Sequence, residues 1–300
     1  MYLFQLIALL LIILIGRAFD ISSESDLGVI CLVVVALVGI PHGALDHKIH
    51  LLSNKNASFK RFMIKYLAIA AVYVLWWVLH SPSALWFFII LSAYHFGQET
   101  MESYELPSSL ITRVLLGSAL LVGSLSFHYD ETYDFVSSIG DGYLMKFPLY
   151  QAQLFGISLG IIAVLYLLIR AFGKKSGANR MKYLKLISFL LLYAAVNSYY
   201  GLLVSFSVYF VLFHSLNAFR HQYEWLKMKY HKYNFALFLK DLSGFSLLAV
   251  VGIAIILVAL DLDNTQQIIT YFFILVSIIT LPHAIEFDQF YKLRDASSKS

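Results

Sequence analysis

Six of the ten histidines in this chain lie where a long apolar segment meets a polar one. They are His42, His47, His95, His214, His221 and His283. Neutral imidazole is the commonest protein ligand of transition metals, so several histidines at one depth of a helix bundle indicate a metal site. A single histidine at such a boundary is more often a hydrogen-bonded interfacial residue. His50 and His231 lie in basic loops and are expected to be solvated.

Polar and conformationally special residues accompany these histidines. The segment "IPHGALDH" places Pro41 before His42 and Gly43 after it, so the helix can kink and another group can come close. Asp46 lies four residues after His42 on the same helical face, where its carboxylate could accept the ring N–H and fix the tautomer. The segment "LPHAIEFDQF" repeats the Pro-His pair at His283. Asp46 is therefore expected to orient a metal ligand.

The segment "FHSLNAFRHQ" carries two histidines on one predicted helix. His214 and His221 are seven residues apart, so they share a face but stand about 10 Å apart along a regular helix. One metal ion could take both only if the helix is irregular at this point.

Aromatic residues make up 16% of the chain, and most are expected to face lipid or the membrane interface. Tyr94, Phe96 and Phe213 differ because they adjoin presumed metal ligands. These three are the candidates to line a site for a long apolar substrate.

The elements that position these residues must be membrane helices. Hydrophobic residues form 60% of the 300 and charged residues only 13%, which is more apolar surface than a soluble core can hide. A helix of roughly 20 apolar residues spans a bilayer. We expect an all-α, polytopic membrane helical bundle that forms a single integral membrane domain over residues 1–300, with helices over about 2–290 and a short polar tail at 291–300. About ten transmembrane helices are predicted, at approximately 2–18, 27–45, 63–80, 82–97, 110–127, 151–170, 183–198, 201–219, 242–260 and 267–284.

The lysines and arginines predict the orientation of these spans. With this set of spans, all but Arg17 and Lys146 of the 22 basic residues fall on one side, which the positive-inside rule makes cytoplasmic. Both termini and the layer of histidines are then expected at the cytoplasmic face of the cell (inner) membrane. The basic loops are explained by topology, so no nucleic-acid partner is expected.

The histidine motifs resemble those of the Brp/Blh family of bacterial and haloarchaeal membrane β-carotene dioxygenases, which supply retinal to rhodopsins. The matching pieces are "PHGALD" at 41–46, "HFG" at 95–97, "FHS" with "RH" at 213–221, and "PHxxxxD", read as Pro282, His283 and Asp288. They occur in the order of the family.

The resemblance implies a non-haem iron dioxygenase. Such an enzyme binds Fe(2+) through four histidines and cleaves the central double bond of β-carotene with O2 into two retinal molecules. By motif, His42, His95 and His214 are ligands. The family has its next histidine four residues after the third, where this chain has Ala218. His221 is therefore preferred as the fourth ligand, and His283 is the alternate.

Further expectations follow from the resemblance. The bilayer would deliver the carotenoid, and a retinal-binding rhodopsin is a possible functional partner. Two other functions stay open. A single haem-b electron-transfer protein would also use one histidine from each of two helices. A diverged family member would act on another carotenoid or apolar substrate.

Overall fold

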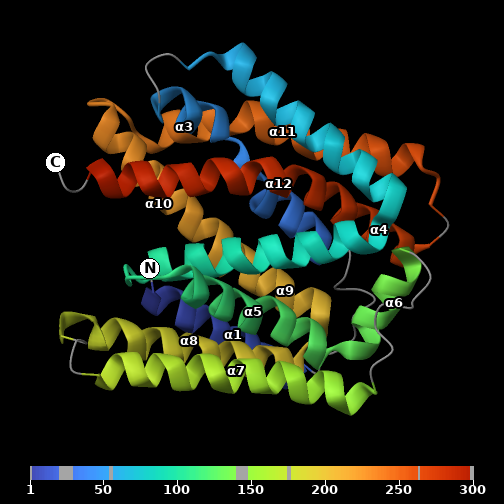
Figure 1. The fold of residues 1–300 in the computed structure, drawn as a ribbon, viewed down its shortest axis with the longest axis vertical. Helices are drawn as coiled ribbons and strands as arrows, with labels where there is room; N and C mark the ends of the chain where they lie inside the picture. Colours follow the sequence, from blue (N-terminus) through green and yellow to red (C-terminus); the bar gives the residue numbers. More distant parts are fainter. Residues whose placement is uncertain are drawn as a thin grey trace. The chain divides into compact units, whose positions relative to one another are not determined.

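The structure, a computed structural model, describes residues 2–19, 30–53, 57–139, 148–173, 177–262 and 264–297 (Figure 1). Every regular element in those ranges is a helix, which confirms the predicted all-α class. In chain order the elements are α1 (Tyr2–Phe19), η1 (Val35–Gly39), η2 (Ile40–Gly43), α3 (Asp46–Ser53), α4 (Phe59–Ser103), α5 (Leu110–Phe127), α6 (Tyr129–Ile139), α7 (Leu149–Phe172), η4 (Gly177–Asn179), α8 (Arg180–Tyr199), α9 (Leu202–Tyr209), η5 (Phe210–Ser215), α10 (Leu216–Lys229), α11 (Phe235–Ala259) and α12 (Thr265–Ser297). The elements η1 and η5 are π-helices, and η2 and η4 are 3-10 helices.

Within the described residues, seven helical segments are long and apolar enough to cross a membrane. They are Ile30–Ser53, Phe59–Ser103, Leu110–Phe127, Leu149–Phe172, Leu202–Lys229, Phe235–Ala259 and Thr265–Arg294. Large apolar side chains on them are mostly exposed: Val78 to 77%, Ile111 to 78% and Val258 to 81%. Exposure of this extent is unfavourable in water and favourable against hydrocarbon, so the chain has the surface of a membrane protein.

The predicted number of about ten spans is not confirmed by this count. Helix α4 counts once, whereas the sequence predicts two spans, at 63–80 and 82–97. The two predicted spans meet at His80, whose backbone is non-helical (φ −157°, ψ 74°) and which lies two residues before Pro82. Helix α1 contributes only the shorter apolar stretch Phe4–Leu14, and α8 is not among the seven. The count of ten and the cytoplasmic termini stay predictions.

The chain divides into two compact units. Unit 1 consists of residues 1–34, 92–137 and 141–217, and unit 2 consists of 35–91, 138–140 and 218–300. Because each unit gathers segments from distant parts of the chain, neither corresponds to one continuous stretch of sequence. The single domain predicted over the whole chain stays a prediction.

Glycines bring α4 and α5 into backbone contact within unit 1. A Cβ atom on Gly97 would lie 1.7 Å from the Arg113 carbonyl oxygen, and one on Gly117 would lie 1.6 Å from the Ala93 carbonyl oxygen. Only residues without a side chain permit this approach, which is typical of helix pairs in membranes. Gly97 of the "HFG" motif therefore fixes the part of α4 that carries His95.

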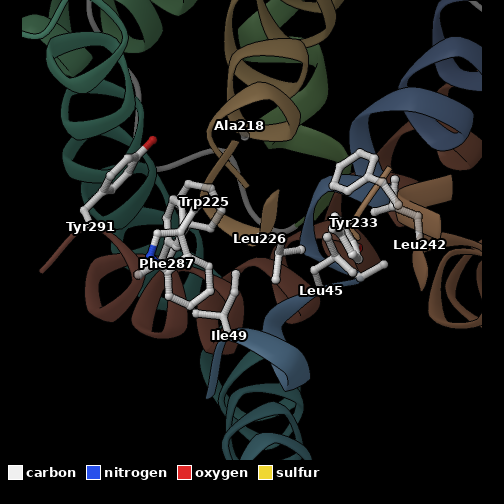
Figure 2. Packing of buried hydrophobic residues seen from close by; sticks show 12 residues of the cluster. Leu45, Ile49, Ala218, Trp225, Leu226, Tyr233, Leu242, Phe287 and Tyr291 are labelled. Atoms are coloured by element: carbon white, nitrogen blue, oxygen red, sulfur yellow. The ribbon is translucent and has the colours of Figure 1, made fainter. Parts of the chain in front are cut away.

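Unit 2 contains an apolar cluster from α3 and the segment that leads into it, α10, α11 and α12. Figure 2 shows Trp225 and Phe287 side by side in this cluster, with Ala218 on the same helix as Trp225. Tyr291 is 1% exposed and belongs to the cluster. The packing of Tyr291 in this cluster accounts for α12 continuing past residue 290, and the helix ends at Ser297. The sequence instead predicts that the helices end near residue 290 and that a polar tail follows.

The glycine contact predicts a clear difference between two glycine substitutions. Gly97→Ala should destabilise the protein by roughly 1–3 kcal/mol because the new methyl group forces α4 and α5 apart. Gly160→Ala, in α7, is the matched control, since a Cβ there meets nothing within 4 Å and alanine favours helix by up to about 1 kcal/mol. Thermal unfolding of the purified protein in detergent measures both. Equal midpoints for the two variants would contradict the contact.

Candidate metal centre

His42 lies at a sharp irregularity of its helix in unit 2. The π-helix η1 changes directly into the 3-10 helix η2, which contains Pro41 and His42. Proline supplies no N–H, so regular helix hydrogen bonding stops here. The Nδ1–H of His42 donates to the carbonyl oxygen of Gly39, which leaves the Nε2 lone pair as the one that can bind a metal. The His42 side chain is 6% exposed.

His283, on α12, faces His42 within unit 2. Their ring centroids are 4.6 Å apart, with the rings nearly perpendicular. The Nδ1 atom of His283 lies 3.0 and 2.9 Å from the two carboxylate oxygens of Asp46, so an Nδ1–H donates to that carboxylate. Asp46 thus holds a histidine, but the partner is His283, whereas the sequence predicts His42. The prediction was wrong about the partner because the change of helix type at η1 and η2 directs the Nδ1 of His42 to its own backbone.

Gly43 provides the space for this arrangement. A Cβ atom on Gly43 would lie 3.0 Å from Nδ1 of His283, a tighter distance than side chains normally tolerate. Sequence analysis predicts close approach at this glycine, and the group that approaches is His283.

A second carboxylate, Glu286, lies one turn after His283 and is 3% exposed. Its oxygens are 3.0 Å from Nδ1 of His50 and 3.4 Å from Nζ of Lys65. The expectation that His50 is solvated was therefore wrong, because α3 turns it toward the buried Glu286. The hydroxyl of Tyr66 lies 3.4 Å from Asp46 and adds a further polar group to this region.

Unit 1 contains a second pair of histidines. His95 on α4 and His214 in the π-helix η5 have ring centroids 5.0 Å apart, and they are 1% and 0% exposed. The Phe210 ring stacks on His214 at 5.1 Å, and the Phe96 ring lies 4.8 Å from it. Two imidazoles therefore lie together in an apolar surrounding. The helix is irregular at His214, in η5, but the segment Leu216–Lys229 that carries His221 is a regular α-helix, so this irregularity does not show that one ion could take both histidines.

Glu99 is a site residue that sequence reasoning did not single out. Its Oε2 atom lies 4.0 Å from Nδ1 of His214, and its Oε1 atom accepts a hydrogen bond from Ser103. The signal was available, because Glu99 is four residues after His95 and therefore on the same face of α4. Glu99 is 1% exposed, and a buried carboxylate beside an imidazole is the group that usually orients a metal ligand.

The three predicted substrate-lining residues have different surroundings. Phe96 contacts the ring of His214 and is 4% exposed. Phe213 packs on Phe189 of α8, with ring centroids 4.4 Å apart. The Tyr94 hydroxyl accepts a hydrogen bond of 3.1 Å from Arg113. Of the three, Phe96 is the one packed against a presumed ligand, and a role of any of them toward substrate stays a prediction.

His221, the predicted fourth ligand, lies in α10 of unit 2 with both ring nitrogens engaged. The guanidinium of Arg220 lies 3.1 Å from Nε2, and the Tyr291 hydroxyl lies 3.2 Å from Nδ1. Because a guanidinium can only donate, Nε2 is the accepting nitrogen, and Nδ1–H donates to Tyr291.

Each unit therefore offers a buried pair of imidazoles: His42 with His283, and His95 with His214. Imidazole nitrogens suit a transition metal such as iron, copper or zinc, and those of His42, His214 and His283 lie near a carbonyl or carboxylate oxygen. A hard cation such as magnesium would instead need a set of oxygen ligands. The donor set therefore fits the ferrous iron that the resemblance implies.

The hydrogen bond from His283 to Asp46 gives a testable expectation about stability. Asp46→Ala should cost roughly 1–3 kcal/mol because the buried Nδ1–H of His283 loses its acceptor. Asp134→Ala, an exposed position in α6, is the control and should change stability by less than about 0.5 kcal/mol. Thermal unfolding compares the two, and equal losses would show that the buried hydrogen bond contributes nothing special.

Comparison with known proteins agrees with the motifs. A family model described as beta-carotene 15,15'-dioxygenase matches residues 33–290 of the 300. Neither the curated proteins nor the solved structures contain a match to the chain. The matched range includes both buried histidine pairs and the residues that support them. The chain therefore belongs to the beta-carotene 15,15'-dioxygenase family.

Proposed function

We propose that this protein is an iron-dependent dioxygenase that cleaves the central double bond of β-carotene. The C15–C15′ double bond breaks, each carbon receives one oxygen atom of O2, and two molecules of retinal result. The family match over residues 33–290 is the observation that carries this proposal. The buried imidazoles give it a chemical basis, since ferrous iron bound by neutral histidines keeps open coordination positions.

The ligands in this proposal are His42, His95 and His214, the three buried histidines that the family motifs supply. The fourth ligand is either His221 or His283. Bound Fe(2+) supplies the binding and activation of O2 beside the polyene. The protein keeps the imidazoles neutral and fixes the orientation of their rings. Aromatic rings such as those of Phe96 and Phe210 exclude water from the histidines of unit 1.

The substrate and the location of the site belong to the same proposal. β-Carotene is apolar throughout, so it partitions into the bilayer and can reach the protein from the lipid phase. Tyr94, Phe96 and Phe213 are proposed to contact it. We place the protein in the cell (inner) membrane, with the iron site near the cytoplasmic face. This orientation follows from the lysines and arginines of the loops, which the positive-inside rule assigns to the cytoplasm. Retinal released into the same membrane would be available to a rhodopsin.

The first test is retinal formation in bacterial cells that accumulate β-carotene and express this protein. Cells with the wild-type chain should turn pale and contain retinal. His42→Ala, His95→Ala and His214→Ala should each leave the cells orange and the purified protein without iron, because one ligand is missing. His231→Ala, an exposed residue between α10 and α11, is the control and should keep retinal and iron at wild-type levels.

Two results would count against the proposal. Wild-type retinal yield in any of the three ligand variants would remove that histidine from the iron site. Orange cells around a folded, iron-containing wild-type protein would show that β-carotene is not the substrate and would favour a diverged member of the family.

The haem alternative predicts a strong Soret absorption, and we expect none. When two histidines bind one haem, the porphyrin lies between their imidazole rings, so the distance between the two rings must be large enough for the porphyrin to fit. The ring centroids are only 4.6 Å apart in the His42–His283 pair and 5.0 Å apart in the His95–His214 pair, so neither pair admits a porphyrin. An absorption spectrum of the purified protein, with iron measured in the same sample, decides the question. A Soret band in proportion to the iron would overturn the dioxygenase.

A further inference from the structure

We propose that Gln5 of α1 is a positioning residue that holds the π-helix η5 and, through it, the ring of His214. This inference rests on the proposed function, in which His214 is an iron ligand. All of the groups involved belong to unit 1. Helix α1 lies outside residues 33–290, which the family model matches, so the family motifs do not supply this role.

Gln5 is the one polar residue in a long apolar stretch of α1. From Leu3 to Gly16 every other residue is apolar or glycine. The Gln5 side chain is only 4% exposed, although the large apolar side chains of Phe4 and Leu14 in the same helix are exposed to 63% and 60%. A buried amide is unfavourable in an apolar surrounding unless it is hydrogen-bonded. Gln5 is therefore kept for a specific partner inside unit 1.

That partner is the backbone of η5. The N–H of Leu216 donates to the carbonyl oxygen of Val211, five residues back, which is the π-helical pattern. In a regular α-helix the same N–H would donate to Leu212, so the Leu212 carbonyl oxygen loses its usual donor. The Nε2 atom of Gln5 donates to this oxygen at 2.6 Å. Gln5 thus replaces the hydrogen bond that the π-helix removes.

Asn217 extends this contact to the next carbonyl. The Nε2 atom of Gln5 also donates to Oδ1 of Asn217 at 3.0 Å, and Nδ2 of Asn217 donates to the Phe213 carbonyl oxygen at 2.6 Å. Because a backbone carbonyl can only accept, these bonds fix which end of each amide is the NH2 group. Gln5 and Asn217, the amide pair, thereby hold the two residues directly before His214.

The amide pair acts on the His214 ring through the backbone. Without its donor, η5 would be free to relax toward α-helical hydrogen bonding, and a shift by one residue rotates a side chain by about 100° around the helix axis. The His214 ring now lies 5.0 Å from that of His95 and 5.1 Å from that of Phe210. Such a rotation would remove both contacts. The orientation of His214 therefore depends on Gln5.

The decisive experiment is solid-state NMR of the full-length, metal-free protein in lipid bilayers, with nitrogen-15 in the histidine rings. Gln5→Met keeps the length of the side chain but has no donor, so the His214 resonances should shift or split into several sets. His214→Ala assigns these resonances by their loss. Leu9→Val is the matched control, because Leu9 is 0% exposed in the same helix and its substitution weakens packing without removing a hydrogen bond. It should leave the resonances in place.

Two further measurements follow the same variants. Backbone amides of η5 should exchange hydrogen roughly tenfold faster in Gln5→Met than in the wild type, because one hydrogen bond that opposes local opening is lost. Gln5→Met should also bind iron roughly tenfold more weakly, as expected when a contact that orients a ligand is removed. Leu9→Val should bind iron as the wild type does.

The outcomes separate this inference from the proposed function. Unchanged His214 resonances in Gln5→Met, or an equal shift in Leu9→Val, would overturn the role of Gln5 and leave the proposed iron site intact. Wild-type iron content in His214→Ala would instead overturn the proposed ligand. If Gln5→Met fails to fold, Asn217→Ala replaces it, since it removes the acceptor of Gln5 and the donor to Phe213. Unchanged His214 resonances in that variant would overturn the inference.

Discussion

The hydrogen bond between Asp46 and His283 is the contact on which the geometry of unit 2 near His42 depends. An imidazole in an apolar helix bundle must have a partner for its N–H, because an unsatisfied buried donor costs more than a typical hydrogen bond contributes. Asp46 provides that partner, and in doing so it fixes which nitrogen of His283 carries the lone pair. The same contact joins the start of α3 to α12, two segments far apart in sequence.

Irregular helix turns are the second constraint. His42 follows a π-helix and lies in a 3-10 turn, and His214 lies within a π-helix. Irregular helix turns of this kind cost backbone hydrogen bonds, so they persist only where the surrounding packing enforces them. π-Helices in particular occur frequently at functional sites. In this chain two of the three motif histidines lie at such turns. The apolar spans around them remain regular helices, which the bilayer requires because it offers backbone groups no other hydrogen-bond partner.

The sequence was sufficient to predict the helical class and the apolar character of the long helices, because both depend on local composition; the number of spans stays a prediction. It also indicated that Gly43 admits a close neighbour and that Asp46 holds an imidazole. It was insufficient where tertiary packing decides. The pairing of Asp46 with His283 joins residues 237 positions apart, and the contact of His50 with the buried Glu286 joins residues 236 apart. Neither follows from periodicity. Glu99 could have been found from its spacing to His95.

The central claim is that buried histidines of this chain hold a non-haem iron. The most direct test is X-ray absorption spectroscopy at the iron edge of the protein purified with ferrous iron. The account predicts light nitrogen and oxygen neighbours and the multiple-scattering pattern of several imidazole rings, with no sulfur and no porphyrin. A porphyrin pattern, or a spectrum without imidazole scattering, would contradict it.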